Sequence, residues 1–201
     1  MKNEQNVPQV RFKGFTDAWE RRELGEVFTQ TSNYVNPKED NVELWSLTVE
    51  EGLIPKNERY TRDFLVKKED KFKEVRPGDI VYNPMNMTLG AIGYNNMSKG
   101  IAVSGYYVTM VTNFNTDSYF INTWLKSPQA ILTYKNYATG SLKEKQRIQF
   151  PTLSAISMPF PSLTEQQQIG NYFSNLDHLI TLHQRWFLYI INIRHFSFIA
   201  A

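Results

Sequence analysis

Cysteine is absent from the 201 residues of this sequence. Its absence excludes a disulfide-bonded scaffold, zinc sites built from thiolates and catalysis by a cysteine nucleophile. Long apolar runs are scarce as well: the longest cluster, WFLYIINI at 186–193, is too short to span a bilayer and is followed by Arg194 and His195. The polar opening MKNEQNVPQVRFKGF contains no apolar segment typical of a signal peptide. We therefore expect a soluble cytoplasmic protein without a membrane partner.

An excess of charge of one sign is also lacking, since the net charge is only +2. No global field indicates a polyanion partner, so any basic surface has to be local. Residues for chemistry are equally sparse. His178 and His183 are five positions apart, a spacing that does not direct both toward one metal ion, and we find no nucleophile elbow or paired-carboxylate pattern. We expect no catalytic residue, no metal and no cofactor in this chain.

One short stretch resembles an enzyme motif only in part. VYNPMN at 81–86 is similar to the Asn-Pro-Pro-aromatic loop of amino-group DNA methyltransferases at Asn83 and Pro84. Met85 and Asn86 stand where that loop has its second proline and the aromatic residue that stacks on a flipped base. The sequence also has no glycine-rich turn that would bind S-adenosylmethionine. We do not expect the chain to be a methyltransferase.

The alternation of short β-rich runs and turns predicts an α+β fold with a twisted sheet and short helices. Strands are expected where Val, Ile, Tyr and Thr concentrate, at 43–49, 59–66, 79–83, 91–95 and 101–111. Helices are expected at 18–28, at 117–138 with a break at Ser127-Pro128, and from about 163 to 195. Pro159 and Pro161 are interpreted as a hinge before the last helix, whose cap is either Thr164, in a capping box with Gln167, or Ser162.

The last predicted helix carries one apolar stripe over its whole length. Its members recur at i, i+3, i+4 and i+7 spacing, and we call them the apolar stripe: Ile169, Tyr172, Phe173, Leu176, Leu179, Ile180, His183, Trp186, Phe187 and Ile190. The stripe could fold back on its own domain, which is the commoner arrangement, or pair with another helix. A helix of some 30 residues extends roughly 45 Å, longer than the ~30 Å of a small domain, which favours a partner helix.

Basic and polar residues in two regions are candidates for contact with DNA. Residues 56–76 contain eight Lys or Arg, among them Arg59 and Arg62, and the glycine-containing loop 140–147 contains three. Such residues contact phosphates, and Asn, Ser and Arg can also read base edges. A merely solvated charged surface is the alternative interpretation. The candidates are Lys143, Lys145, Arg147, Ser141, Asn83, Asn86, Ser104, Tyr107, Arg59 and Arg62, together with Tyr106.

Three stretches make the sequence closely resemble the specificity subunit of Type I restriction-modification enzymes. They are VPQVRFKGFTDAWERRELGEVF at 7–28, the pair RPGDIVYN and GIAVSGYYV at 76–83 and 100–108, and FPSLTEQQQIGNYFSNLDHLITLHQR at 160–185. The resemblance implies a subunit with two recognition domains, each reading half of a split DNA site, held apart by two antiparallel helices. It further implies modification subunits that bring S-adenosylmethionine and methylate adenine, and a motor-nuclease subunit that uses ATP and magnesium.

The sequence departs from the family pattern in two respects. It contains one recognition domain instead of two, and after Arg185 it continues with an atypical tail, 186–201, where the family has a charged, Lys- and Leu-rich helix. We therefore expect a non-catalytic half-subunit: a DNA-recognition domain at 1–160 and, at 161–201, a helix that forms a homodimer and docks modification subunits. Two alternatives stay open: a decoy that captures modification subunits without reading DNA, and a stand-alone DNA-modifying enzyme.

Overall fold

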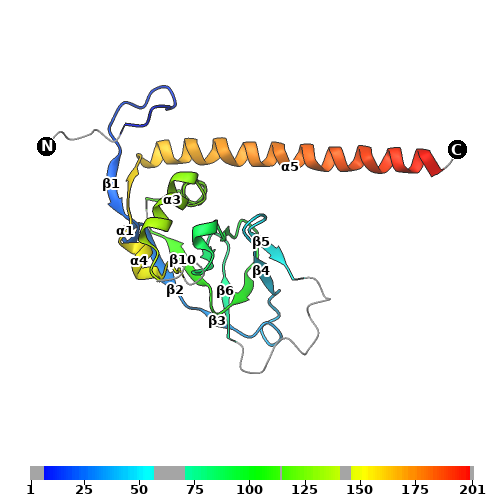
Figure 1. Cartoon of the computed structure of the whole chain (residues 1–201), viewed down its shortest axis with the longest axis horizontal. Coiled ribbons are helices and arrows are strands. Elements are labelled where there is room, and N and C mark those ends of the chain that lie inside the picture. Colours follow the sequence, from blue (N-terminus) through cyan, green and yellow to red (C-terminus); the bar gives the residue numbers. More distant parts are fainter. Residues whose placement is uncertain (1–6, 57–70, 114, 141–145, 200–201) are drawn as a thin grey trace.

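The computed structural model describes residues 7–56, 71–113, 115–140 and 146–199, with side chains in the last helix as far as Phe187. Figure 1 shows a mixed α+β body and a long helix, α5 (Leu163–Ile199), that passes over it and continues far beyond it. The predicted α+β class is confirmed. Among the helices that the structure describes, none combines the length and the apolar composition that a membrane crossing requires.

The central sheet is antiparallel, with strand order β2-β10-β7-β8. Its strands are β2 (Phe28–Thr31), β10 (Val108–Thr112), β7 (Ile80–Tyr82) and β8 (Ile92–Tyr94). Two helices pack against it, α2 (Ser118–Leu125) and α3 (Pro128–Tyr137). Together they bury the main core, which includes Tyr82, Ile92, Met110, Leu125 and Tyr134. These fully buried apolar side chains fix the sheet and therefore the loops at its ends.

A second, three-stranded sheet lies beside the first, with order β3-β6-β9. It consists of β3 (Tyr34–Val35), β6 (Phe72–Val75) and β9 (Ile101–Ser104), and the hairpin of β4 (Trp45–Leu47) and β5 (Leu53–Pro55) lies next to it. Val75, Val81, Ile101 and Val103 form a smaller core between the two sheets.

The base of the long helix is attached to a two-stranded sheet. Strand β1 (Glu20–Glu23) pairs with β11 (Ser157–Phe160), and the short helices α1 (Leu24–Val27) and α4 (Phe150–Ser154) lie beside them. A single 3-10 turn, η2 (Met87–Leu89), completes the described elements. Because β11 runs directly into α5, this small sheet determines where the helix starts.

Most predicted elements are present, with two corrections. The short helical turn expected within 18–28 is present only at 24–27, and residues 20–23 form a strand instead. Pairing with the distant β11 outweighs the local helical preference. The predicted strand at 101–111 is two strands, β9 and β10, separated by a turn. The predicted strand at 59–66 lies outside the described residues.

The predicted proline hinge is also wrong. Pro159 is part of β11 opposite Arg21, and Pro161 is buried, with its carbonyl accepting a hydrogen bond from Gln166 Nε2 at 2.9 Å. Ser162 rather than Thr164 caps the helix, because its Oγ accepts from the backbone N–H of Glu165 at 3.4 Å. The junction between β11 and α5 is therefore bonded in place rather than free to bend.

Candidate nucleic-acid interface and partner helix

Three loops gather at one end of the central sheet, which we call the loop end. At this end β2 and β7 finish while β10 and β8 begin, so residues 32–33, which lead to Tyr34 of β3, and residues 83–91 and 105–107 emerge side by side. Val108 lies opposite Tyr82 in the β10–β7 pair. In an antiparallel pair the next positions outward then face one another, which places Tyr107 beside Asn83.

The loop after β7 is tightly folded by its own amides. Asn83 Oδ1 accepts a hydrogen bond from the backbone N–H of Met85 at 3.0 Å, and the Asn83 carbonyl accepts from the N–H of Asn86 at 3.0 Å. This is the Asx-turn geometry that asparagine adopts in loops. Asn83 is half-buried and its side chain stabilises the turn, whereas Asn86 is exposed. Of the two predicted asparagines, Asn86 is thus the better placed to contact a ligand.

The turn between β9 and β10 presents a tyrosine. The N–H of Gly105 donates to the carbonyl of Lys71 at 2.8 Å. A Cβ at Gly105 would clash with that carbonyl oxygen, so only glycine fits. Tyr107 is half-buried and packs on the smaller core, while Tyr106 is exposed. Its exposure makes Tyr106 better placed than Tyr107 to contact a ligand. Ser104 is half-buried at the start of the same turn.

A buried lysine supports this turn from beneath. Lys73 Nζ donates to the carbonyl of Tyr107 at 2.7 Å. Its side chain is almost fully buried, and burial lowers the pKa of the ammonium group because a charged amine loses its hydration there. Lys73 therefore belongs to the scaffold of the loop end rather than to its surface.

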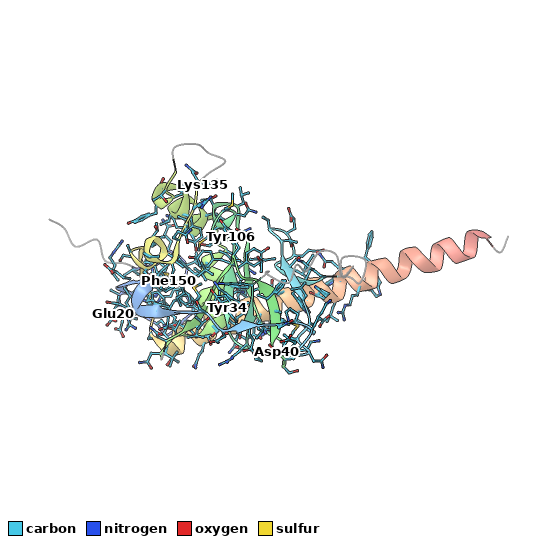
Figure 2. All side chains as sticks on the ribbon, turned by 90° about the horizontal axis from the view of Figure 1, so that it is seen from below. Glu20, Tyr34, Asp40, Tyr106, Lys135 and Phe150 are labelled. Atoms are coloured by element: carbon cyan, nitrogen blue, oxygen red, sulfur yellow. The ribbon has the colours of Figure 1, made fainter. Side chains whose placement is uncertain are left out.

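Lys71 and Tyr34, which no sequence pattern places together, complete the loop end. Lys71 Nζ lies 5.8 Å above the ring centroid of Tyr34, within the range of a cation–π contact. Tyr34 is 59% exposed, and Figure 2, which views the body from the side away from α5, labels both Tyr34 and Tyr106. No sequence motif marks Tyr34; only the sheet register brings it here.

The predicted basic loop starts and ends beside the same site. Thr139 and Arg147 form an isolated antiparallel bridge, and the N–H of Ile148 donates to the carbonyl of Pro84 at 3.0 Å. Arg147 is exposed and thus lies next to the Asn83–Asn86 turn. Ser141, Lys143 and Lys145 lie outside the described residues, as do Arg59 and Arg62.

The loop end therefore presents three kinds of group that can contact a ligand. Arg147 and Lys71 supply positive charge, and Asn86 supplies an amide that can both donate and accept hydrogen bonds. Tyr34 and Tyr106 add exposed aromatic rings with hydroxyl groups. In the part of the chain that the structure describes, no group of three His, Asp or Glu side chains could hold a metal ion. The arrangement suits contact with a polyanion and its polar edges.

The second candidate surface is α5, whose two faces differ. The face toward the body is small or polar, with Gly170 against α2 and with Ser174, Asp177 and Thr181 along an open cleft of about 610 Å³. At 100° per residue the apolar stripe lies roughly 140° around the helix from this face. Apart from Ile169, which packs against the main core, the stripe therefore points away from its own domain.

Exposure of the stripe follows from this orientation. Ile169 and Leu176 are half-buried, and Ile169 packs against the main core. The exposed members are Tyr172, Phe173, Leu179, Ile180, His183, Trp186 and Phe187, with Ile180 54% and Phe187 61% exposed. The side chain of Ile190 lies outside the described ones. Apolar side chains gathered in this way on a helix are typical of an interaction surface.

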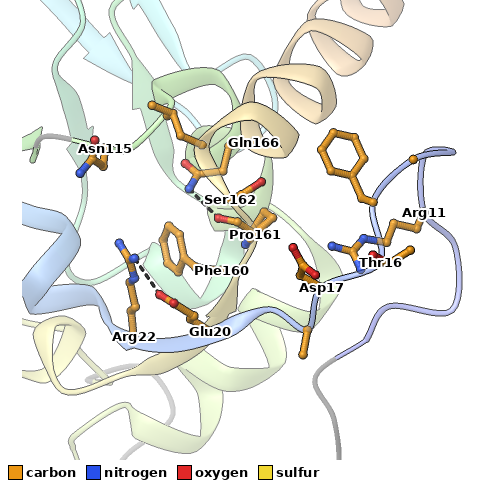
Figure 3. A pocket seen from close by; sticks show the side chains of 14 residues that line it. Arg11, Thr16, Asp17, Glu20, Arg22, Asn115, Phe160, Pro161, Ser162 and Gln166 are labelled. Carbon is orange, nitrogen blue, oxygen red and sulfur yellow. Dashed lines mark hydrogen bonds and ion pairs between the residues drawn. The ribbon is translucent and has the colours of Figure 1, made fainter.

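At the base of α5 a pocket of about 410 Å³ opens between β1, the helix and the N-terminal arm, residues 7–19 (Figure 3). Arg11 and Gln166 line it from two sides, and Arg22 lines it from β1, where it pairs with Glu20 at 2.8 Å. Glu165, at the same base, is fully buried.

Comparison with known proteins identifies related sequences and folds. Residues 16–186 match the sequence model of the family described as "Type I restriction modification DNA specificity domain". No curated protein matches the chain.

Two solved structures share the fold. One, reported in work on "complex assembly and conformational transition of the type I R-M system", is 15% identical with a TM-score of 0.54, and the match covers 86% of this chain and 42% of that one. The Type-I restriction-modification system S subunit from M. genitalium is 14% identical with a TM-score of 0.53, covering 83% of this chain and 41% of that one. The chain thus spans about two fifths of the length of the structures it matches.

Proposed function

The chain belongs to the Type I restriction modification DNA specificity domain family, and from this premise we propose that it reads one half of a split DNA site. Members of this family recognise DNA and are generally not catalytic themselves. In our proposal residues 1–160 form the recognition domain, and residues 161–201 form the helix that joins it to partners. The observation that carries the proposal is the gathering of exposed cations, amides and tyrosine hydroxyls at the loop end.

Each side chain at the loop end suits a particular contact with duplex DNA. Arg147 can bind a phosphate or, with two donors, the edge of a guanine, and the Asn86 amide matches the edge of an adenine. Lys71, beside the Tyr34 ring, suits a phosphate contact that gives position rather than sequence preference. The hydroxyl of Tyr106 can donate a hydrogen bond to a phosphate or to a base edge. The predicted bases Lys143 and Lys145 would extend the same surface from the loop between Thr139 and Arg147.

The exposed stripe of α5 supports a homodimer. Phe173, Ile180 and Phe187 recur at intervals of seven, and so do Leu176 and His183, which is the spacing of a coiled-coil seam. An isologous pair with antiparallel helices would cover the stripe of each copy with that of the other. The two recognition domains would then lie at opposite ends and read a symmetric, interrupted site.

Other subunits would supply the chemistry. We propose that modification subunits carrying S-adenosylmethionine dock on the paired helices and methylate adenine in the bound site. A motor-nuclease subunit, with ATP and magnesium, would cleave unmodified DNA. The atypical tail from Trp186 onward is the part of this chain where docking would differ from that of a full-length subunit.

Selection of bound duplexes from a random pool, with and without modification subunits, tests this function. We expect an interrupted palindrome, and gel filtration with light scattering should give a dimer. Capture of modification subunits without any DNA selection would instead support the decoy. Binding of S-adenosylmethionine, or magnesium-dependent cutting by the purified chain, would support an enzyme.

A further inference from the structure

Two stretches at opposite ends of the sequence meet at the base of α5. Arg11 and Trp19 come from the N-terminal arm, and Glu165 and Gln166 come from the first turn of the helix. Arg11 and Glu165 are 154 positions apart in the chain. We call these four residues the base clamp.

The ionic part of the base clamp centres on one buried carboxylate, that of Glu165, with Arg11 partly buried beside it. Arg11 Nε and Nη2 donate to the two oxygens of Glu165, both at 2.7 Å, and Trp19 Nε1 donates to Oε2 at 3.1 Å. Glu165 is 0% exposed. A bidentate pair has one favourable geometry, and loss of either partner would leave a buried charge uncompensated. The arm is therefore bound to the helix in a single orientation.

The amide part of the base clamp binds the opposite side of the helix turn to the body. Gln166 is fully buried; its Nε2 donates to the carbonyl of Pro161, and its Oε1 accepts from the N–H of Asp117 at 3.0 Å. One turn later, a Cβ on Gly170 would lie 2.5 Å from Asp117 Oδ1 and 2.9 Å from Phe120 N. The helix thus lies directly on the start of α2, at a distance that only glycine permits.

We propose that the four residues of the base clamp are positioning residues that fix the angle at which α5 leaves the recognition domain, and thereby the spacing between the two half-sites. The lever is long. From Leu163 to Phe187 the helix extends about 36 Å, so a tilt of about 10° at the base displaces its far end by about 6 Å. That is nearly two steps of duplex DNA at about 3.4 Å each. Contacts between paired helices further along α5 would not restore the angle between the helix and its own domain.

The inference rests on the proposed function for its DNA consequence, but not for its mechanical one. The mechanical consequence can be measured on the chain alone. Because the sequence has no cysteine, spin labels can be placed at Gln30→Cys in the body and Gln184→Cys on the helix, both exposed positions. Mixing with excess unlabelled chain keeps the measured distance within one copy. Double electron–electron resonance then gives the spread of helix angles.

The variants are Arg11→Ala, Trp19→Phe and Glu165→Gln, and Arg22→Ala is the matched control. Arg22 lines the same pocket and also loses one positive charge on replacement, but its partner is the exposed Glu20 and not the helix. We expect the width of the distance distribution at least to double in Arg11→Ala and to stay unchanged in Arg22→Ala. Trp19→Phe and Glu165→Gln serve if Arg11→Ala does not give a cooperative melt.

The second measurement uses the selected site with its central spacer lengthened or shortened by one or two base pairs. The wild type should prefer one spacer by tenfold or more, and Arg11→Ala should reduce that preference to threefold or less while binding the best spacer within threefold of wild type. A distance distribution as narrow as wild type in every clamp variant would overturn the inference. A broad distribution in a chain that selects no DNA would sustain the clamp and remove the proposed function instead.

Discussion

The ring of Phe12 meets the ring of Tyr172 edge-on, with their centroids 5.6 Å apart and their planes at 71°. This contact joins the N-terminal arm to the first part of the apolar stripe. Beyond it, from Phe173 to Phe187, the stripe stays largely exposed. The arm therefore covers part of the start of the stripe and leaves the remainder uncovered. In the proposed dimer, that remainder would pair with the second copy. A second helix would meet Phe12 and Tyr172 together at the end of the seam.

Gly170 permits the close approach of α5 to α2, so replacing it with alanine should destabilise the fold. In an exposed helix the change from glycine to alanine normally stabilises by about 0.5–1 kcal/mol. Here the added Cβ would lie 2.5 Å from Asp117 Oδ1, and overpacking of this kind costs about 1–3 kcal/mol. We expect Gly170→Ala to lower the free energy of unfolding in urea titrations. Asn171→Ala, at the exposed neighbouring position, is the control; if both variants gain stability, the contact is not as close as described.

The sequence predicted the parts of the fold that local chemistry determines. Runs of Val, Ile and Tyr indicated β7 to β10, and Ser127-Pro128 correctly marked the break between α2 and α3. Strand β1 was missed because its structure depends on β11, where Glu20 lies opposite Phe160. A local pattern carries no information on so distant a partner.

The same distinction applies to the candidate site. Asn86 and Arg147 were predicted from residue type and turn context, and the amphipathic stripe from its period. The nearness of Asn83 to Tyr107 follows from the register of β7 and β10, which the sequence does not encode in any visible motif. Tyr34 was missed for that reason. The partners of Glu165 were missed because they lie at the other end of the chain.

Association through α5 predicts opposite outcomes for two adjacent positions. Ile180→Lys places a charge in the middle of the apolar stripe, whereas Thr181→Lys places the same charge on the face toward the cleft. Burying an unpaired charge between two helices would cost several kcal/mol. We expect Ile180→Lys to be monomeric in light scattering at micromolar concentration and Thr181→Lys to resemble wild type. Equal behaviour of the two variants would exclude the stripe as the dimer seam.

Lys73 predicts a pH dependence of stability. Burial lowers the pKa of its ammonium group below the ordinary value of 10.5. Between the lowered folded value and 10.5 the unfolded chain binds more protons than the folded one, so this group makes stability rise with pH through that window. Lys73→Met removes the titration together with the hydrogen bond to the Tyr107 carbonyl.

The measurement is the difference in unfolding free energy between wild type and Lys73→Met at a series of pH values from neutral to about 10.5. We expect wild type to gain relative to the variant as the pH rises. Lys135→Met, at an exposed position on α3, is the control for the loss of a lysine charge. If the difference in unfolding free energy between wild type and Lys73→Met does not change with pH, burial does not disfavour the charged form of Lys73.

Arg147 and Asn86 should affect DNA binding in different ways if the loop end is the reading surface. Each protein cation that contacts a phosphate releases about one counterion from the DNA. The slope of log K against log salt is therefore negative, and Arg147→Ala should reduce its magnitude by about 1. Asn86→Ala should leave that slope unchanged and instead weaken the selected site relative to random duplex, by about 1–3 kcal/mol if the amide reads a base. Arg76→Ala is the control, because Arg76 precedes β7 at the opposite end of the sheet and pairs with Glu74. Both quantities come from fluorescence anisotropy on labelled duplexes at several salt concentrations. Loss of the slope in Arg76→Ala, with Arg147→Ala behaving as wild type, would move the interface to the other end of the sheet.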